Sequence, residues 1–292
     1  MTQKALKIVV LAKQVPDTRN VGKNAMKEDG TVNRAALPAI FNPEDLNALE
    51  QALRLKDMVP GSTVQILTMG PSRAADVIRE GLFRGTDGGV LLTDRKFAGA
   101  DTLATSYALS RAILKMQPDV VIAGRQAIDG DTAQVGPQVA EKLGWPQVTY
   151  VETIESVDNN EITLKRRLDR GVELVAGSFP LVFTVNASAA ACRPRHAKAL
   201  MKYKKAKAAS ESQNPDDSYL ELKKAKDYLT IPEWGVNDID GDMNSYGLSG
   251  SPTKVKKIEN IVFAAKESKR LTAVNDDIDA LMKELIANHT IG

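Results

Sequence analysis

The sequence predicts an α/β fold of the doubly wound type, in which a mostly parallel sheet carries helices on both faces. Apolar runs of strand length alternate with helical patterns up to Trp145, and this alternation is typical of parallel sheets. Beyond Trp145, alternating apolar and polar residues between turn signals indicate added antiparallel strands. After residue 208 the periodicity is weak. We therefore expect an α/β domain at residues 1–208 and an extended C-terminal arm at residues 209–292.

The first half of the chain supplies the parallel strands and the helices between them. A buried strand is expected at residues 7–12, followed by a polar excursion in which Asp29 and Gly30 indicate a turn and permit a small hairpin. Asn42, Pro43 and the two acidic residues after them are typical of a helix start, and a well-capped surface helix explains them without a ligand. Further strands are predicted at residues 63–69, 89–93 and 120–123, and further helices at residues 73–83, 101–117 and 136–144.

The second half combines further strands with segments of weaker pattern. Strands are predicted at residues 148–155 and 180–185, with a hairpin of residues 161–167 and 172–176 between them. Residues 193–205 are basic with interleaved apolar positions, and both a solvated helix face and a docking surface explain them. A polar linker is expected at residues 209–218. Residues 220–250 have so little core of their own that we predict an arm packed on a partner chain, which an amphipathic helix at residues 275–288 could also reach.

Composition and charge exclude several classes of function. With 43% hydrophobic and 26% charged residues, the 292-residue chain is typical of a soluble globular protein. A net charge of +2, from 39 basic and 37 acidic residues, does not indicate a basic surface for binding nucleic acid. No apolar run approaches the ~20 residues of a membrane span, and the N-terminus is typical of a strand rather than a signal peptide, so we expect a cytoplasmic protein. One cysteine, Cys192, excludes an internal disulfide, and two distant histidines predict no metal site.

The loop at residues 124–136 joins a short apolar run to a helix through small residues. Such a junction leaves backbone N–H groups unpaired at the helix start, where they and the helix dipole can bind an anion such as a diphosphate. Asp131 and Gln134 have capping-box spacing, but Pro137 favours an irregular turn over residues 130–135, with Gly130 at positive φ. An ordinary strand–loop–helix crossover explains the same residue types, and the loop is neither a Walker A nor a GxGxxG motif.

Charge in this loop complicates the anion hypothesis. Asp129 and Asp131 repel phosphate, so they must point away from the anion, toward a ribose or a partner, or the site is not for phosphate. Arg125 could offset one of them. The predicted sheet favours a nucleotide, because ligands of doubly wound sheets bind beyond the carboxyl ends of the strands. Three predicted strand ends, at residues 11–13, 68–70 and 123–125, would lie along one edge of the sheet.

Four motifs, taken in order along the chain, resemble one known family. They are the sequences KQVPDT at residues 13–18, NPED at residues 42–45, MGP at residues 69–71 and GRQAID at residues 124–129. They are similar to successive landmarks of the β subunits of electron-transfer flavoproteins, and the match covers nearly the whole chain. The resemblance implies an adenine-nucleotide α-hydrolase-like domain and a heterodimer with an α subunit that carries a flavin.

The resemblance also implies an adenine-nucleotide site. In respiratory members of this family the nucleotide is a structural AMP, and in electron-bifurcating members it is a second FAD. The expected cofactor-binding residues are Leu11, Ala12, Lys13, Asn42, Asp45, Met69, Gly70, Gly124, Arg125, Gln126, Ala127, Ile128, Asp129, Gly130, Asp131, Thr132, Ala133, Gln134 and Val135.

Two segments resemble the bifurcating group. Residues 129–137 carry small side chains where respiratory members tend to carry bulkier ones, and residues 247–255 are similar to that group's C-terminal segment. The resemblance then implies an FAD that exchanges a hydride with NADH or NAD⁺. It also implies electron transfer between ferredoxin and a dehydrogenase flavin, of acyl-CoA or lactate type, through the α subunit. No side chain is expected to be catalytic, because the flavin carries the chemistry.

Residues 194–201 are similar to the family's recognition loop for dehydrogenases. Arg195, His196, Ala199 and Leu200 are the expected docking residues, although His196 stands where a tyrosine is common. Two alternatives to a bifurcating subunit stay open. One is an electron-transfer subunit with structural AMP. The other, of a different class, is a nucleotide-sensing binding protein without a redox role. The long arm argues against this alternative, because a sensor that acts alone has no need of it.

Overall fold

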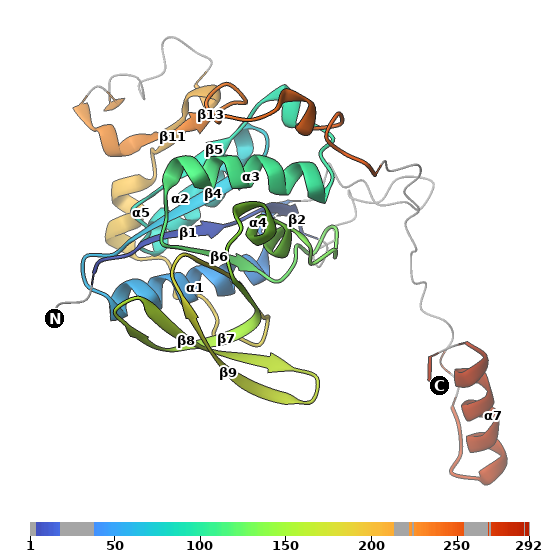
Figure 1. Cartoon of the computed structure of the whole chain (residues 1–292). Coiled ribbons are helices and arrows are strands. Elements are labelled where there is room, and N and C mark those ends of the chain that lie inside the picture. Colours follow the sequence, from blue (N-terminus) through green and yellow to red (C-terminus); the bar gives the residue numbers. More distant parts are fainter. Residues whose placement is uncertain are drawn as a thin grey trace.

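A nine-stranded sheet forms the centre of the molecule (Figure 1). The structure, a computed structural model, describes residues 4–17, 38–212, 222–223, 225–253, 268, 270–288 and 290–291. Within these residues the strand order is β13-β5-β4-β1-β6-β10-β7-β8-β9. The mutually parallel strands are β1 (Lys7–Leu11), β4 (Thr63–Met69), β5 (Gly88–Leu92), β6 (Val120–Gly124), β7 (Gln147–Asp158), β10 (Leu181–Val185) and β13 (Glu233–Trp234). Two antiparallel strands, β8 (Glu161–Leu168) and β9 (Gly171–Ser178), extend the sheet beyond β7.

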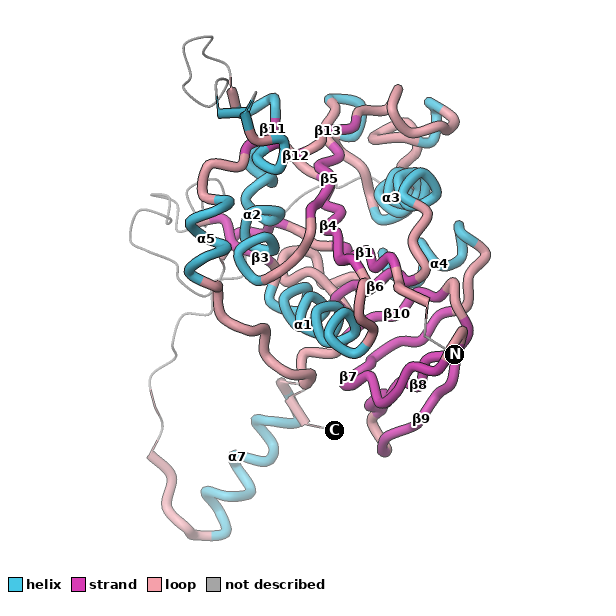
Figure 2. Tube along the Cα trace, turned by 90° about the vertical axis from the view of Figure 1, so that its left-hand side faces the viewer, coloured by secondary structure: helices cyan, strands magenta, loops and turns pink. Residues whose placement is uncertain are grey.

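Helices cover both faces of the parallel part, as Figure 2 shows. Helices α1 (Pro43–Met58) and α2 (Ala75–Arg84) lie on one face, and α3 (Thr102–Met116) and α4 (Val135–Leu143) lie on the other. Strand β1 explains this arrangement at the level of sequence. Ile8 and Val10 belong to the core under α1 and α2, whereas Val9 and Leu11 belong to the core under α3 and α4. A strand buried on both faces is apolar throughout, and the predicted doubly wound class is confirmed.

The order of the strands brings three carboxyl ends together. The chain passes from β1 to its neighbour β4 on one side, and from β5 to β6 on the other side of β1. The winding direction therefore reverses at β1, which is the kind of switch point where doubly wound sheets bind ligands. As the sequence predicted, the ends of β4, β1 and β6 lie along one edge.

A small ribbon leaves the sheet next to this edge. Strand β2 (Gln14–Pro16) pairs in antiparallel fashion with β3 (Ala39–Phe41). The expected turn at Asp29 and Gly30 lies outside the described residues. The predicted hairpin of β8 and β9 is confirmed, and its outer strand is exposed, with Leu174 at 69% of its full accessibility.

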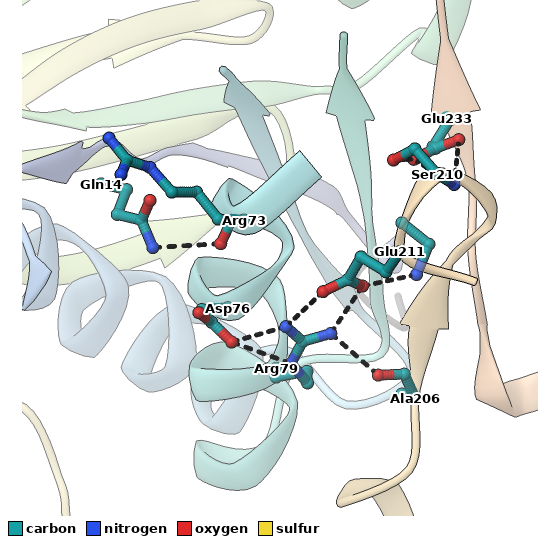
Figure 3. A network of polar contacts seen from close by, with 9 residues as sticks. Gln14, Arg73, Asp76, Arg79, Ala206, Ser210, Glu211 and Glu233 are labelled. Atoms are coloured by element: carbon teal, nitrogen blue, oxygen red, sulfur yellow. Dashed lines mark hydrogen bonds and ion pairs between the residues drawn. The ribbon is translucent and has the colours of Figure 1, made fainter. Parts of the chain in front are cut away.

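The start of the C-terminal arm is anchored to the domain, which corrects the expected polar linker. Strand β11 (Lys207–Ala208) pairs with β12 (Thr230–Ile231). Figure 3 shows Arg79 of α2 between Asp76, at 2.5 Å, and Glu211, at 2.8 Å, with a further bond to the carbonyl of Ala206. The ion pair between the part-buried Arg79 and Glu211 holds the segment up to Ser212 on the domain. The rest of the expected linker, residues 213–218, lies outside the described residues.

Residues 225–253 also pack on their own domain. Strand β13 adds to the sheet beside β5, and Val236, Ile239 and Tyr246 are buried in the core under α3. The expectation that this stretch has little core was therefore wrong, because a two-residue edge strand and a few scattered apolar contacts leave no periodic pattern. Packing of the arm on a partner chain stays a prediction, as does the domain boundary after residue 208.

Two helices lie outside the layers. Helix α5 (Ala197–Tyr203) follows β10 and lies beside α2, and α7 (Asn275–Ala287) confirms the expected C-terminal helix. Figure 1 shows α7 apart from the sheet, and it has no buried residue. A helix with the length and hydropathy to cross a membrane is absent from the described part of the chain.

Candidate nucleotide-binding site

A cleft of about 690 Å³ opens at the carboxyl ends of β4, β1 and β6, on the face covered by α3 and α4. Most residues expected from the sequence line it: Leu11, Ala12, Lys13, Asp45, Met69, Gly124, Arg125, Gln126, Ala127, Gly130, Asp131, Thr132, Ala133, Gln134 and Val135. Asn42, Gly70, Ile128 and Asp129 do not line it. Instead, the Asn42 side chain accepts the backbone amide of Ile128, and the Asp129 carboxylate pairs with Lys13.

The first turn of α1 holds the loop at the floor of the cleft. Asn42 is fully buried, donates its side-chain amide to the carbonyl of Gln126 at 2.9 Å, and accepts the amide of Ile128 at 3.2 Å. Glu44 accepts the amide of Gln126 at 3.1 Å and pairs with Arg125 at 2.9 Å. The interpretation of these residues as a capped surface helix was therefore incomplete. Asn42 precedes the helix but makes no side-chain capping bond, and its polar groups serve the loop instead.

Asp45 joins the ends of two strands. Its carboxylate accepts the amide of Lys13, after β1, at 2.8 Å and the amide of Gly124, in β6, at 3.2 Å. The side chain is 7% exposed, and burial raises the pKa of Asp45 to about 7 although the Lys13 amide bonds to its charged form. Gly124 allows this approach, because a Cβ there would lie 2.3 Å from the Asp45 Oδ1.

The second half of the loop presents free N–H groups. Among the described residues, the amides of residues 132–136 have no hydrogen-bond acceptor, and α4 begins at Val135 within this run. Its N-cap residue, Gln134, makes no side-chain capping bond. Consecutive amides at a helix start form a concavity that binds anions. The expected irregular turn before the helix is thus present, and the helix begins one residue before the predicted start.

The backbone of this turn differs from the expectation in one respect. Asp131 and Ala133 take left-handed conformations, with φ of 50° and 52°, whereas Gly130 does not. A Cβ on Gly130 would meet no atom within 4 Å. Gln134, rather than Asp131, is the N-cap residue of α4, and Asp131 accepts a bond from the Gln126 side chain at 3.1 Å. The prediction of positive φ at Gly130 was wrong, because closing the turn onto α4 imposes that conformation on its neighbours.

The acidic side chains of the loop are partly balanced from within the chain. Lys13, which follows β1 and lines the cleft, pairs with Asp129 at 2.8 Å. The expected balancing residue, Arg125, pairs with Glu44 instead. This pairing is the main reason that the pKa of Arg125 lies above its ordinary value.

The far wall of the cleft was not found from the sequence. It consists of Phe97, Gly99, Ala100, Asp101, Thr102, Thr105, Leu109 and Thr253, with Leu67 at the floor. Asp101 was recognised only as a helix start, and it is the N-cap of α3. Thr253 falls within the C-terminal segment noted for its family resemblance. The contact between them spans 152 positions in the sequence, which no local pattern reveals.

The four expected docking residues lie on the other side of the molecule, at the start of α5. Arg195 pairs with Glu80 of α2 at 2.6 Å, and the amide of His196 bonds to the carbonyl of Phe83. His196 is exposed and Ala199 half-buried, while Arg195 and Leu200 line a second groove of about 650 Å³. Their role in docking stays a prediction. In the part of the chain that the structure describes, no group of acidic, histidine or cysteine side chains could hold a metal ion.

Comparison with known proteins places the chain in a family. Residues 29–215 match the electron transfer flavoprotein domain. The chain is 41% identical to the electron transfer flavoprotein subunit beta of Clostridium acetobutylicum, over 97% of this chain and 95% of that protein. It is 39% identical to the protein of the same name from Megasphaera elsdenii, over 98% and 100%. It is 38% identical to the caffeyl-CoA reductase-Etf complex subunit CarD of Acetobacterium woodii, again over 98% and 100%. With such identity over almost its whole length, the chain belongs to the electron transfer flavoprotein family as a β subunit.

Proposed function

We propose that this chain binds FAD in the cleft and acts as the β subunit of an electron-bifurcating or confurcating flavoprotein. Its partner is an α subunit, and the heterodimer exchanges a hydride with NADH or NAD⁺ in the cytoplasm. Electrons pass to or from ferredoxin and, through the α subunit, a flavin dehydrogenase. The observation that carries the proposal is the run of free amides at residues 132–136, which lines the same cleft as the apolar side chains of Leu11, Met69 and Phe97.

The residues present fit a dinucleotide. The amides of residues 132–136 and the positive end of α4 would hold the diphosphate without a basic side chain. Leu11, Met69, Phe97 and Leu109, which belong to one apolar cluster, line the cleft and offer an apolar surface for a ring system. Sites of this kind combine apolar walls with a few fixed polar groups.

The extent of the cleft supports FAD over AMP. Beyond the free amides it continues to Asp101 and Thr253, and the loop side chains along it include Gly130, Ala133 and Gly136. Glycine and alanine at these positions keep the loop side of the cleft open, which supports the larger of the two nucleotides. Two relatives are named as subunits of acyl-CoA-type reductase systems, the caffeyl-CoA reductase complex and an acryloyl-CoA reductase electron transfer subunit of Anaerotignum propionicum. Their names favour a dehydrogenase of acyl-CoA type over one of lactate type as the partner in an anaerobic metabolism.

The bound flavin would supply the hydride and electron transfer. The chain's own residues position it and set its surroundings. Glu44 neutralises Arg125, and Lys13 neutralises Asp129, so Asp131 is the one charged side chain of the described loop without an ion pair. Asp45 fixes the distance between the two strand ends on which the cofactor would lie.

The test is to co-express the chain with its α subunit and count the bound nucleotides. We expect two FAD per heterodimer, one of which is bleached by NADH. One FAD plus one AMP would overturn the proposal in favour of an electron-transfer subunit with a structural nucleotide. A chain that binds ATP, carries no flavin and does not respond to NADH would instead indicate a nucleotide sensor.

A further inference from the structure

The C-terminal segment at residues 246–253 supports the far wall of the cleft. Tyr246 packs edge-to-face on Phe97, with ring centroids 5.5 Å apart. Gly247 has φ of 55°, and a Cβ there would lie 2.0 Å from the carbonyl oxygen of Lys96, so only glycine permits this approach. The Ser251 hydroxyl accepts the amide of Asp101 at 2.9 Å and donates to the carbonyl of Gly247 at 2.7 Å. The segment and the wall are therefore one packed unit.

Asp101 connects this segment to the start of α3. One carboxylate oxygen accepts the amides of Leu103 and Ala104, at 2.9 and 3.0 Å. The other accepts the amide and the hydroxyl of Thr253, at 3.1 and 2.8 Å. Both Asp101 and Thr253 line the cleft. One carboxylate thus fixes the wall of the site and the last described residue before the chain continues toward α7.

Helix α7 carries an apolar face with no partner in the described part of the chain. Ile278, Leu281, Met282 and Ile286 are 37–55% exposed and share one side of the helix by their spacing. Helix α7 thus offers an apolar face to a partner chain.

We propose that Asp101 and Thr253 are positioning residues, through whose contact the segment at residues 246–253 holds the cofactor in the cleft. The inference rests on the proposed function, because it concerns retention of the proposed FAD. Coupling of this kind is reciprocal in free energy: a seated segment tightens binding of the cofactor, and a bound cofactor stabilises the seated segment by the same amount.

The experiment uses the full chain co-purified with its α subunit and loaded with FAD. Thr253→Val removes the hydroxyl and keeps its shape, and Thr253→Ser restores the hydroxyl. Thr272→Val is a matched control, because Thr272 bonds to Asp277 through its amide and hydroxyl, at 2.9 and 2.6 Å, next to α7 and outside the cleft. The readouts are the rate of FAD release after dilution and hydrogen exchange of residues 246–253 with and without FAD.

We expect Thr253→Val to release FAD about tenfold faster, the effect of losing one charge-assisted hydrogen bond. Thr253→Ser and Thr272→Val should release it at the wild-type rate, and FAD should slow exchange in residues 246–253 of the wild type. If the wild type holds a second FAD but Thr253→Val releases it no faster, or FAD leaves exchange unchanged, this inference is overturned and the proposed function stands. If the wild type holds no second FAD, the proposed function fails first.

Discussion

The two halves of the loop at residues 124–136 treat their polar groups in opposite ways. In the first half, Gln126 and Ile128 bond to Glu44 and Asn42, and Gly124 bonds to Asp45. In the second half, the amides of residues 132–136 have no acceptor among the described residues. One short loop therefore contains an anchor that is hydrogen-bonded to Asn42 and the first turn of α1, and a run of free amides at the cleft.

The difference shows which part of the loop carries the free-energy cost of polar groups without protein partners. Buried polar groups without partners cost about 1–3 kcal/mol each, and the buried side chains of Asn42, Glu44 and Asp45 all bond to the first half of the loop. The amides of the second half lie at the cleft, where water or a ligand can satisfy them. A fixed first half allows the second half to keep its shape while those amides are free of protein partners, which is the preorganisation that ligand binding needs.

The largest effect is expected for Gly124→Ala, which attacks the anchor. The new Cβ would lie 2.3 Å from the Asp45 Oδ1 and 2.7 Å from the Glu44 carbonyl carbon, and backbone cannot move aside as a side chain can. We expect a loss of about 3 kcal/mol of unfolding free energy. Gly130→Ala is the matched control in the second half, where a Cβ meets nothing within 4 Å, and should change stability by less than ~0.5 kcal/mol.

Urea unfolding of both variants measures the contrast. Equal stability losses would show that the two halves do not differ in rigidity. A Gly124→Ala variant that fails to fold at all, beside a folded Gly130→Ala, would show the contrast in its strongest form.

Asp45→Asn tests the same anchor through its charge. Burial raises the pKa of Asp45 from its usual value near 3.8 to about 7, so between these values the folded protein holds a proton that the unfolded chain has lost. Stability of the wild type, relative to Asp45→Asn, should therefore fall as the pH rises from ~4 to ~7, by about 2–4 kcal/mol.

Glu50, on the same helix, gives the opposite case. Burial opposes its ionisation, but hydrogen bonds from Arg193 outweigh burial and lower the pKa of Glu50. Relative to Glu50→Gln, the wild type should lose stability as the pH falls through the carboxylate range. Denaturant titrations at a series of pH values measure both slopes. Parallel curves for the wild type and Asp45→Asn would contradict the role given to the buried carboxyl.

The sequence predicted the elements of this cleft better than their contacts. Apolar runs located β1, β4 and β6 to within a residue, and doubly wound topology then brought their ends together. The bonds from Asn42 to the loop were missed because capping explains an asparagine before Pro43 equally well, and their partners are 84 and 86 residues away. Left-handed φ at Ala133 was also missed, since it follows from closing the loop and not from the residue type.

The smallest effect is expected at the Lys13–Asp129 pair, which joins the end of β1 to the loop at 2.8 Å. Such part-exposed pairs contribute about 0–1 kcal/mol, so neither Lys13→Gln nor Asp129→Asn should change stability much. They should change anion binding in opposite directions. Lys13→Gln leaves an unpaired carboxylate beside the free amides and should weaken AMP or FAD binding roughly threefold, whereas Asp129→Asn should strengthen it by a similar factor at low salt.

Isothermal titration at two ionic strengths separates charge from structure in these variants. Lys4→Gln is the control, because Lys4 pairs with Asp119 at the same 2.8 Å but before β1 and β6, at the opposite edge of the sheet. It should leave nucleotide affinity unchanged. Both cleft effects should shrink at high salt, because screening weakens exposed charges more than backbone hydrogen bonds. If both cleft variants instead weaken binding equally at any salt concentration, the pair acts by holding the loop in place, and the second half of the loop depends on a fixed contact just as the first half does.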